Sequence, residues 1–562
     1  MNMLAKAASL GSYQMAVDQA VVEMRQDRVI ERTLAHDHTL WKPDPTEITN
    51  RLGWLDIANR MIGEIDRLQT FTQSLRDAGY THALLLGMGG SSLAPELFCK
   101  TFGVKTGFLD VSVLDSTDPG TVLRFARSLE MRKTLFMVAT KSGGTVETLS
   151  GFKYFYNRVI EAIGESQAGE HFIAITDPGS SLIDLAIKYN FRQTFLNDPN
   201  IGGRYSALSL FGLVPAALIG VDLPTLLQQA TRMAATCQTE DDNPATWLGA
   251  VMGELAKSGR DKLTFITSAA IASVGDWVEQ LIAESTGKEG KGILPVVGEA
   301  LGAPGVYRAD RLFVHLRLND DPAHEAAVQK LRDAGHPVIL VDINDSIELG
   351  GQIYLWELAT AIAGSRLAIN PFDQPNVEAA KILAREMVAA YLKSGSLPPQ
   401  QPILSSGGIE VYSTIGLAAK DAVSAITEVI AQTLPGAYVA LQAYVESTPE
   451  TEKLLQQIRV KLRDSSKLAT TLGYGPRFLH STGQLHKGDA GKGLFIQITA
   501  TDAEDTPIPD EAGSDASRMS FGVLKLAQAL GDGQALRDGG RQVIQLHMTD
   551  LKTGLKRLAD KL

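Results

Sequence analysis

Short apolar runs recur along the chain, and each is followed by turn residues and then by a segment of helical periodicity. In the first part of the chain these runs cover residues 83–86, 111–114, 135–139 and 172–175. A second series covers residues 263–266, 311–314 and 337–341. Strands joined by helical crossovers form parallel sheets that are buried under helices on both faces. The alternation therefore predicts two α/β domains in tandem.

The regions outside these two series predict a helical arm and a third domain. Residues 13–75 show helical periodicity with one break at residues 42–45, which read Lys-Pro-Asp-Pro. The Ser, Gly and Pro residues at 394–399 are typical of a linker, and strand-like runs follow at 438–441 and 494–498. The predicted parts are a helical arm over residues 1–75, α/β domains over 76–235 and 236–393, and a C-terminal α/β domain over 400–562.

The composition narrows the class of protein. The chain has 562 residues, of which 44% are hydrophobic and 21% charged, so it can bury several cores. A net charge of −11 disfavours non-specific binding to nucleic acid or to an anionic membrane, although a local basic site can still hold an anion. The two cysteines, Cys99 and Cys237, lack metal or redox spacing, and no secretory signal is seen, which favours the cytoplasm. The apolar residues 208–223 are interrupted by two glycines and a proline and predict a buried helix.

The strongest candidate for a ligand site is the segment 140–148, TKSGGTVET, which lies between a strand-like run and an amphipathic stretch. The first turn of a helix has N–H groups without intrahelical partners and roughly half a positive charge from the helix dipole. Hydroxyls at Thr140, Ser142 and Thr145 and two glycines let the backbone surround an oxyanion. The alternative is that Ser142 or Thr145 only caps the helix.

A second glycine-rich turn, GMGGSSLAP at residues 87–95, also precedes a predicted helix. A dinucleotide fingerprint would need glycine where Ser92 stands, and no GxxxxGK[ST] motif occurs in the chain. The turn therefore indicates close approach of the backbone to some other ligand, with Ser91 or Ser92 able to bond its oxygens. A tight structural turn is the alternative.

Two further segments place one charged residue beside glycines. Arg204 follows two glycines in IGGRYS, and a guanidinium offers a planar fork to oxyanions. Glu284 ends an apolar helical run in QLIAESTGKEG, where partial desolvation would suit a carboxylate to proton transfer. The alternatives are a surface arginine in a loop and a solvated glutamate on a helix.

The segment NPFDQP at residues 370–375, followed by Lys381, completes a set of five segments. In their order and spacing, over about residues 80 to 385, these segments resemble the glucose-6-phosphate isomerase (phosphoglucose isomerase) family. The glycine-rich segment 475–488 is similar to the isomerase portion of transaldolase–isomerase fusion proteins. The resemblance implies two sugar-isomerase-type α/β/α sandwiches with parallel sheets and an active site between them, in a chain that usually forms a homodimer.

The resemblance also implies roles for single residues. Glu284 would move a proton between C2 and C1, Arg204 would stabilise the enediolate, and Lys381 would assist ring opening. The phosphate would be held by Thr140, Lys141, Ser142 and Thr145. The sugar would be lined by Gly90 and Ser91, with its hydroxyls oriented by Gln280 and Gln374.

One family residue has no counterpart. The family has a ring-opening histidine a few dozen residues after the catalytic glutamate, but residues 285–312 contain no histidine. The nearby candidates are Glu299, Tyr307 and Arg308, and the distant ones are His480 and His486 in the glycine-rich segment of the third domain. In some family members a histidine also comes from the other subunit of the dimer. The ring-opening group stays open at this point.

The predicted activity is the interconversion of glucose 6-phosphate and fructose 6-phosphate through an enediolate, without a metal or redox cofactor. No His, Asp and Glu residues show convincing metal-ligand spacing in the sequence. One alternative is a broader isomerase that also uses mannose 6-phosphate. Another is a non-catalytic regulator that binds a phosphosugar, although a sensor would need the anchor and not the combination of Glu284, Arg204 and Lys381.

Overall fold

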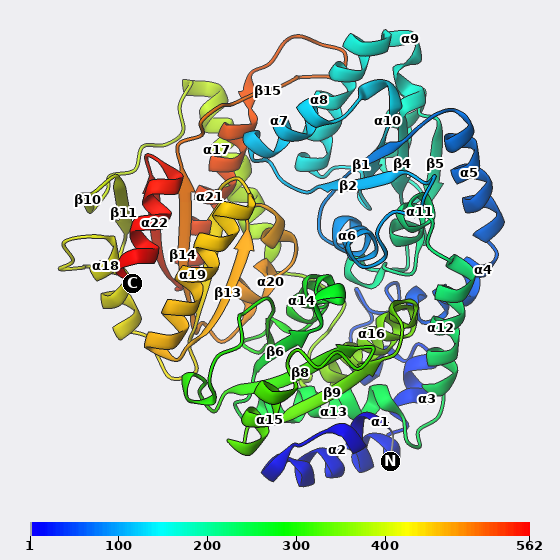
Figure 1. Ribbon diagram of the computed structural model, residues 1–562, viewed down its shortest axis with the longest axis vertical. Helices are drawn as coiled ribbons and strands as arrows, with labels where there is room; N and C mark the ends of the chain where they lie inside the picture. The colour runs from blue at the N-terminus through cyan, green and yellow to red at the C-terminus, as the bar shows by residue number, and fades with distance from the viewer. Residues whose placement is uncertain (1–2) are drawn as a thin grey trace.

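The computed structural model describes residues 3–562 and begins with a helical arm. The arm comprises α1 (Met3–Ala7), α2 (Gln14–Gln26), α3 (Val29–Leu34), α4 (Ile57–Ile62) and α5 (Ile65–Asp77). Ser9 pairs with Val338 in an isolated antiparallel bridge, and α2 packs on α13 (Pro244–Lys257). The start of the arm therefore lies against the second domain, at the bottom of Figure 1.

The first sheet is parallel throughout, with the strand order β2-β1-β3-β4-β5. Its strands are β1 (His82–Gly87), β2 (Asp110–Leu114), β3 (Thr134–Ala139), β4 (Phe172–Thr176) and β5 (Gln193–Leu196). The helices that follow them are α6 (Gly90–Phe102), α7 (Pro119–Ser128), α8 (Val146–Ile163), α9 (Glu165–Ala168), α10 (Ser181–Lys188) and α11 (Leu210–Ile219). Alternate residues of the central strands enter different apolar clusters on the two faces, as Met137 and Phe136 do. This is why these strands are continuous apolar runs.

The second sheet is also parallel, with the order β7-β6-β8-β9. Its strands are β6 (Lys262–Thr267), β7 (Leu294–Val296), β8 (Arg311–Leu318) and β9 (Val338–Ile343). Its helices are α12 (Leu223–Thr236), α13, α14 (Ser273–Thr286), α15 (Glu325–Asp333) and α16 (Leu349–Arg366). The sequence pattern did not predict β5 or β7, because strands of four and three residues are too short to show a period.

The third sheet is mixed and lies in the C-terminal part of the chain, with the order β10-β11-β17-β14-β12-β13. Strands β12 (Tyr438–Tyr444), β13 (Ala469–Tyr474), β14 (Gly493–Ala500) and β17 (Gln542–Met548) are parallel, and β11 (Ile409–Ser413) and β10 (Leu404–Ser406) add an antiparallel edge. A short hairpin joins β15 (Pro507–Ile508) and β16 (Met519–Ser520). The helices are α17 (Val377–Ser394), α18 (Ala422–Ala431), α19 (Pro449–Ser466), α20 (Gly483–Gly488), α21 (Phe521–Asp538) and α22 (Leu551–Lys561).

Several single turns of 3-10 helix connect these elements. They are η1 (Gly11–Tyr13), η2 (His38–Leu40), η3 (Gly53–Asp56), η4 (Met131–Lys133), η5 (Gly169–His171), η6 (Gly203–Tyr205), η7 (Ala269–Ile271), η8 (Pro304–Val306), η9 (Ser346–Glu348) and η10 (Arg477–His480). Two of them, η6 and η10, carry candidate site residues.

The predicted fold class is confirmed: helices precede two parallel α/β sheets and a C-terminal α/β unit. The exact domain boundaries stay a prediction, and residues 1 and 2 of the predicted arm lie outside the described residues. The apolar stretch 208–223 contains α11, whose residues are all buried, as expected. Within residues 3–562, no helix combines the length and the apolar character that crossing a membrane would require.

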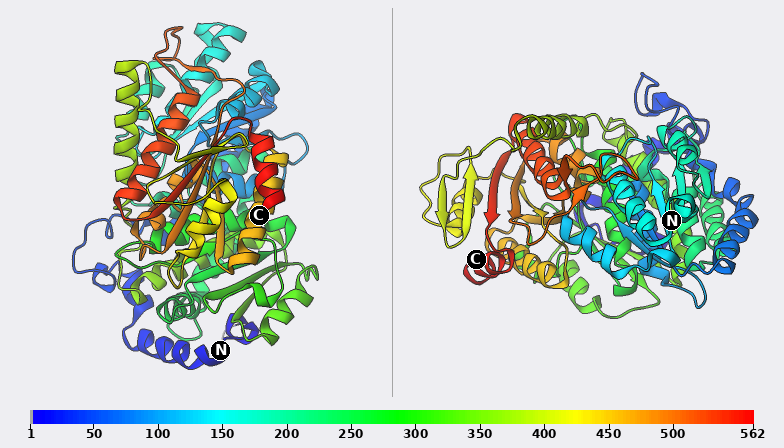
Figure 2. Two further views of the ribbon diagram at one scale, coloured as in Figure 1. Left: turned by 90° about the vertical axis from the view of Figure 1, so that its left-hand side faces the viewer. Right: turned by 90° about the horizontal axis from the view of Figure 1, so that it is seen from above.

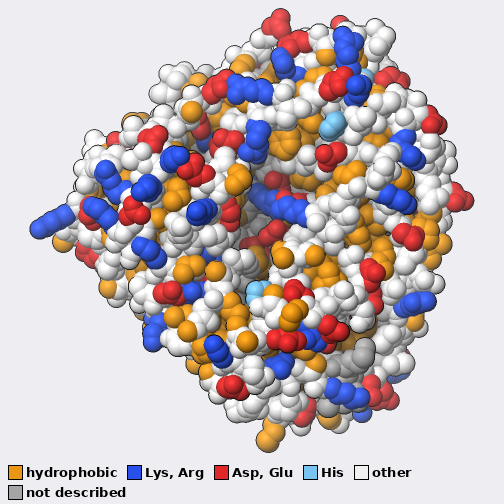
Figure 3. All heavy atoms as spheres, viewed as in Figure 1, with side chains coloured by type: hydrophobic (Ala, Val, Ile, Leu, Met, Phe, Trp, Pro, Cys, Tyr) orange, Lys and Arg blue, Asp and Glu red, His pale blue; other side chains and the backbone are white. Residues whose placement is uncertain are grey.

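The third domain packs against both parallel domains. Seen from above, it forms one end of the molecule and the first domain the other (Figure 2). Val296 of the second domain shares an apolar cluster with Tyr438 and Phe495, and Phe152 of the first domain shares another with Phe521. The face drawn in Figure 3 is hollowed near its centre, and acidic and basic side chains gather around the hollow.

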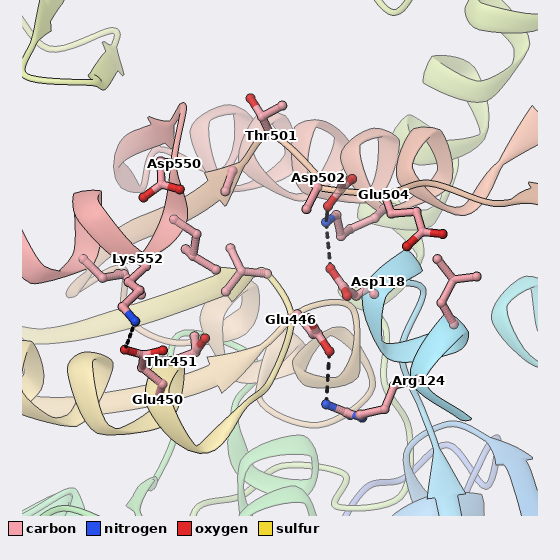
Figure 4. A pocket seen from close by; sticks show the side chains of 18 of the residues that line it. Asp118, Arg124, Glu446, Glu450, Thr451, Thr501, Asp502, Glu504, Asp550 and Lys552 are labelled. Carbon is pink, nitrogen blue, oxygen red and sulfur yellow. Dashed lines mark hydrogen bonds and ion pairs between the residues drawn. The ribbon is translucent and has the colours of Figure 1, made fainter. Parts of the chain in front are cut away.

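The seam between α7 and the third domain is polar. It encloses a cavity of about 850 Å³ beyond the carboxyl ends of β12 and β14 (Figure 4). Arg124 contacts Glu446 at 3.1 Å, and Lys525 contacts Asp118 at 2.8 Å. These ion pairs join the first domain to the third, so the two domains are held by charge as well as by apolar contact.

Candidate active site

The hydroxyl-rich turn lies where the sequence predicted it, between β3 and the N-terminus of α8. Thr145 occupies the N-cap position of α8, but its side chain makes no capping hydrogen bond. Instead, its Oγ1 lies 2.8 Å from Oγ1 of Thr140. The capping alternative is therefore not the arrangement seen for Thr145. The first turn of α8 is left to meet an anion with its own N–H groups.

Lys141 brings a cation to the same turn. Its Nζ pairs with the carboxylate of Asp177, directly after β4, and donates to the carbonyl of Pro199 at 3.0 Å. Burial raises the pKa of Asp177, and the nearby ammonium of Lys141 opposes that rise. The lysine is thus held at the rim of the turn by a carboxylate from the neighbouring strand.

The two glycine-containing turns pack directly on each other. A Cβ added to Gly90 would lie 1.9 Å from the carbonyl oxygen of Gly203, so this approach needs glycine. Gly89, at φ +56°, lies beneath the carbonyl of His480 and the amide of Gln280. The turn after β1 is therefore more than a local structural turn, because it is the surface on which the other site segments meet.

Arg204 and Glu284 form the charged centre of the site. Nη1 of Arg204 lies 3.4 Å from Oε1 of Glu284, and their side chains are only 2% and 13% exposed. The arginine also donates to Ser285 Oγ at 2.8 Å and to Gln374 Oε1 at 3.1 Å. Gln280 donates to Glu284 Oε2 at 3.1 Å. Neither the surface arginine nor the solvated glutamate of the alternatives is what the structure shows.

The loop at residues 370–375 is fixed to this centre. Arg204 donates to the carbonyls of Pro371 and Asp373, at 2.6 and 3.0 Å. Lys288 donates to the carbonyl and the carboxylate of Asp373, at 2.5 and 2.7 Å. Burial, with Arg204 nearby, lowers the pKa of Lys288 to about 8. Two cations thereby hold the loop that presents Gln374.

His480 reaches the site from the third domain. Its carbonyl accepts from Gln280 Nε2 at 2.7 Å, and its ring Nε2 donates to Glu147 Oε1 at 2.9 Å. Gln528 donates to the same oxygen at 2.7 Å. Burial raises the pKa of Glu147, but His480 and further cations outweigh this and lower it. Because Glu147 is an ionised acceptor, the proton lies on Nε2 of His480 and Nδ1 is the second ring nitrogen.

These segments enclose a cavity of about 670 Å³. Of the residues predicted from the sequence, the cavity is lined by Gly90, Ser91, Thr140, Lys141, Ser142, Thr145, Gln374 and His480. Arg204, Glu284 and Gln280 lie behind this wall and contact it through Gln374 and His480. One cavity thus has hydroxyls at one side and a buried carboxylate–arginine pair behind the other.

The remaining candidates lie elsewhere. Lys381, on α17, lines a neighbouring cavity of about 560 Å³ that shares Ser142, Thr145 and His480 with the first. Its Nζ lies 3.8 Å from Glu378, and its side chain is 48% exposed. His486 is buried among aromatic rings, and burial keeps its pKa well below the usual value.

The other ring-opening candidates also lie apart from the cavity. Glu299 is paired with Arg311, and the hydroxyl of Tyr307 accepts from Gly302 N at 2.6 Å. Arg308 donates to the carbonyl of Ser466. None of the three lines the cavity that holds the predicted substrate residues.

Sequence reasoning missed the partners of the predicted residues. Glu147 stands inside the predicted segment 140–148 and was not singled out, although a carboxylate in the first turn of a helix is a usable signal. Gln528, Lys288 and Asp177 gave no local signal, since each matters only through a contact made by the fold.

The site thus combines two parallel α/β domains, a hydroxyl-lined turn at a helix N-terminus and an Arg–Glu pair that is largely shielded from solvent. The model of the phosphoglucose isomerase family matches residues 55–291 of the chain. A probable glucose-6-phosphate isomerase of Methanococcus maripaludis is 29% identical over 387 residues, or 60% of this chain and 85% of that protein. The glucose-6-phosphate isomerase of Carboxydothermus hydrogenoformans is 28% identical over 378 residues, or 57% and 81%. Over about 60% of its length the chain is therefore similar to glucose-6-phosphate isomerases.

Solved structures agree on the fold. A hypothetical protein from Thermus thermophilus aligns with a TM-score of 0.57 and 24% identity, over 68% of this chain and all of that one. A glucose-6-phosphate isomerase from Chlamydia trachomatis aligns with a TM-score of 0.56 and 18% identity, over 66% and 86%. At these identities the alignments show the shared fold alone.

Proposed function

We propose that this chain catalyses the reversible isomerisation of glucose 6-phosphate and fructose 6-phosphate through an enediolate, in glycolysis and gluconeogenesis. The observation that carries the proposal is the buried Arg204–Glu284 pair beside a cavity whose wall is the hydroxyl turn of Thr140 to Thr145. An aldose–ketose interconversion needs one carboxylate, one nearby positive charge and an anchor away from the reacting carbons.

In this proposal the turn before α8 binds the phosphate. Thr140, Ser142 and Thr145 donate hydroxyls, Lys141 supplies a cation, and the helix N-terminus supplies N–H groups. The contact between the hydroxyls of Thr140 and Thr145, at 2.8 Å, supports this role, because both can turn toward an anion when one binds. Gly90 and Ser91 line the sugar between the anchor and the reacting carbons.

Glu284 is proposed to carry the proton between the two carbons. From fructose 6-phosphate it takes a proton from C1 and returns it to C2, and the reverse transfer serves glucose 6-phosphate. Arg204, 3.4 Å from the carboxylate, stabilises the negative oxygen of the enediolate. Gln280, which donates to Glu284, and Gln374, which accepts from Arg204, orient the sugar hydroxyls.

His480 is proposed to open the sugar ring. A protonated imidazole donates its proton to the ring oxygen while a water molecule takes the proton of the anomeric hydroxyl, so that the bond between the anomeric carbon and the ring oxygen breaks and the open carbonyl forms. The carboxylate of Glu147, 2.9 Å from Nε2, fixes the orientation of the imidazole. Lys381, in the neighbouring cavity that also contacts His480, assists this step.

The third domain would then be part of the catalyst and not only of the scaffold. Because His480 belongs to the same chain as Glu284, ring opening would not depend on a histidine from a second subunit. We also propose that this domain is similar to the isomerase portion of transaldolase–isomerase fusions. The protein is further proposed to form a homodimer and to be cytoplasmic.

The direct test is incubation of the protein with fructose 6-phosphate in D2O without added metal. We expect glucose 6-phosphate that carries deuterium at C2, because the proton on Glu284 exchanges with solvent before it is returned. Absence of both product and exchange would reject the isomerase and favour a non-catalytic regulator. Mannose 6-phosphate assayed in parallel decides whether the substrate range is broader.

A further inference from the structure

Arg477 lies three residues before His480, on the same short turn, η10. Its side chain extends from the third domain, and its guanidinium lies against residues of the first domain. It pairs with the carboxylate of Glu96 on α6, and its Nη1 lies 3.3 Å from Asp115 Oδ2, directly after β2. A planar guanidinium with two carboxylate partners fixes both the distance and the orientation of the segment that carries it.

The carboxylates around Arg477 form a cluster, which we call the carboxylate nest: Glu96, Asp115, Asp276 and Glu279. Burial raises the pKa of Glu96, but Arg477 and Lys100 outweigh it and lower the value to about 2. Burial raises the pKa of Asp115 and of Asp276. The nest therefore has more carboxylates than cations, and removal of its arginine would leave buried negative charge without a partner.

The nest is built on the two helices that position the rest of the site. Glu96 lies on α6, which begins at Gly90, and Asp276 and Glu279 lie on α14, which carries Gln280 and Glu284. Arg477 thus pairs directly with α6 and interacts electrostatically with α14, the helix that carries the proposed base. A shift of the guanidinium relative to α6 would move His480 relative to the sugar.

His480 is held at two further points. Its carbonyl accepts from Gln280 on α14, and its ring contacts Glu147 on α8. Both contacts act on His480, which is the last residue of η10. Arg477 holds the first residue of the same turn.

We propose that Arg477 is a positioning residue. Its ion pairs with the carboxylate nest fix the position of the His480 turn of the third domain relative to the two parallel α/β domains. The inference rests on the proposed function and deepens it. Arg477 does not touch the substrate, so its effect is confined to the step that His480 performs. The expected signature is loss of ring opening with proton transfer retained.

The test compares two substrates of the same length. Fructose 6-phosphate closes its ring through O5, while O6 carries the phosphate. In 5-deoxyfructose 6-phosphate O5 is missing, so no five- or six-membered ring can form and the ketone is always open. Both compounds place phosphate and C1 at the same spacing. Deuterium incorporation at C1 therefore reports proton transfer with ring opening for the first compound and without it for the second.

We expect Arg477→Met to lower kcat for fructose 6-phosphate about 10- to 100-fold, with KM changed by less than about threefold, since a misplacement near 1 Å can cost about 100-fold. Turnover of 5-deoxyfructose 6-phosphate should stay within about twofold. His480→Asn should likewise lower turnover of fructose 6-phosphate and leave turnover of 5-deoxyfructose 6-phosphate nearly unchanged. Arg477→Lys, which keeps the charge but not the planar fork, should recover part of the loss. Equal losses on both substrates, or no loss on either, would overturn the positioning role.

A second variant separates positioning from folding. In Arg477→Met combined with Glu96→Gln and Asp115→Asn, the two direct partners no longer carry charge, so the buried charge that destabilises the single variant is reduced. This triple variant should fold, and it should still turn over fructose 6-phosphate slowly and 5-deoxyfructose 6-phosphate normally. If it fails to fold, Arg477 is needed for folding and the proposal is rejected. Arg518→Met, at a 73% exposed arginine of the third domain, is the matched control and should change neither substrate.

Failure of the inference is distinguishable from failure of the proposed function. Glu284→Gln should abolish exchange with both compounds, including the open ketone. If Glu284→Gln retains exchange on 5-deoxyfructose 6-phosphate, the base assignment is wrong whatever Arg477 does. If Glu284→Gln loses both and Arg477→Met also lowers both equally, the function stands and the positioning role does not.

Discussion

The hydroxyl-rich turn before α8 and the His480 turn are built in different ways. The turn before α8 is contiguous: Thr140 and Thr145 are five residues apart, and Lys141 finds its carboxylate 36 residues away. The His480 turn depends on distant partners, since its contacts with Gln280, Glu147 and Glu96 span 200, 333 and 381 residues. The proposed phosphate anchor can be encoded in one strand–turn–helix segment, whereas the proposed ring-opening group is placed by contacts that only the whole fold provides.

The largest expected effect on turnover comes from Glu284, the proposed base. Glu284→Gln should lower turnover of fructose 6-phosphate by about 1,000-fold or more while phosphosugar binding is retained, because the amide cannot accept the proton. Initial rates and equilibrium binding of fructose 6-phosphate check this. The control is Glu289→Gln, because Glu289 lies on the same segment as Glu284 but is exposed and pairs with Lys42. Its turnover should equal that of the wild type. Unchanged turnover in Glu284→Gln would show that the base lies elsewhere.

The next effect tests the contact between the two glycine turns. Gly90→Ala places a Cβ 1.9 Å from the carbonyl oxygen of Gly203, so one of the two backbones must move. We expect kcat/KM to fall about 100-fold and the free energy of unfolding to fall by about 2 kcal/mol, as for an overpacked core. Gly202→Ala, whose added Cβ meets atoms no closer than 3.8 Å, is the control for kinetics and urea unfolding. Equal behaviour of the two variants would contradict the close approach.

The sequence was sufficient for the parts that depend on local pattern. The apolar runs located the central strands of both parallel sheets, because strands buried on both faces are largely apolar. The segment 140–148 was predicted from its own nine residues as a turn between a strand and a helix, and this arrangement is confirmed, while its role in binding an anion stays a prediction. The short strands β5 and β7 were missed because they carry too few residues to show a period.

The sequence was insufficient where a contact joins distant segments. It offered His480 and His486 as equal candidates for ring opening, since both stand in one glycine-rich segment. Only the packing separates them: His480 lines the cavity, while His486 is enclosed by Tyr438 and Phe495. The partner Gln528 has no neighbour in the sequence that points to the site, and Arg477, although it stands in the segment 475–488, acts through Glu96 and Asp115, which only the fold brings close.

A smaller effect examines the contiguous anchor. Thr145→Val removes one hydroxyl with little change of shape, so we expect KM for fructose 6-phosphate to rise about 10-fold and kcat to change little, in keeping with the loss of one hydrogen bond to a charged group. Thr148→Val is the matched control, because the hydroxyl of Thr148 is buried and has no hydrogen-bond partner among residues 3–562. Inhibition constants for inorganic phosphate should follow the same order. A KM that rises equally in both variants would argue against an anion at this turn.

The effect expected to be smallest for turnover concerns the carboxylate nest that Arg477 of the His480 turn contacts. Burial, with Asp276 nearby, raises the pKa of Glu279 from 4.5 to about 8. Between these values the folded protein binds a proton that the unfolded chain has released, so this group makes the free energy of unfolding fall as pH rises from 4.5 to 8. Glu279→Gln cannot titrate and should remove that fall. Because one pKa unit corresponds to about 1.4 kcal/mol, we expect the variant to gain up to about 4 kcal/mol more relative to wild type at pH 9 than at pH 5, measured by urea unfolding.

The same comparison distinguishes the nest from an ordinary surface carboxylate. Glu450 is 57% exposed and pairs with Lys552, so Glu450→Gln should show no such rise in relative stability between pH 5 and pH 9. A gain for Glu279→Gln that is constant with pH would mean that Arg477 and Arg459, which lower the pKa of Glu279, balance its burial. A gain that grows with pH would mean that the nest lacks cations even with Arg477 docked, as expected if the arginine is held there to orient a turn and not to neutralise the cluster.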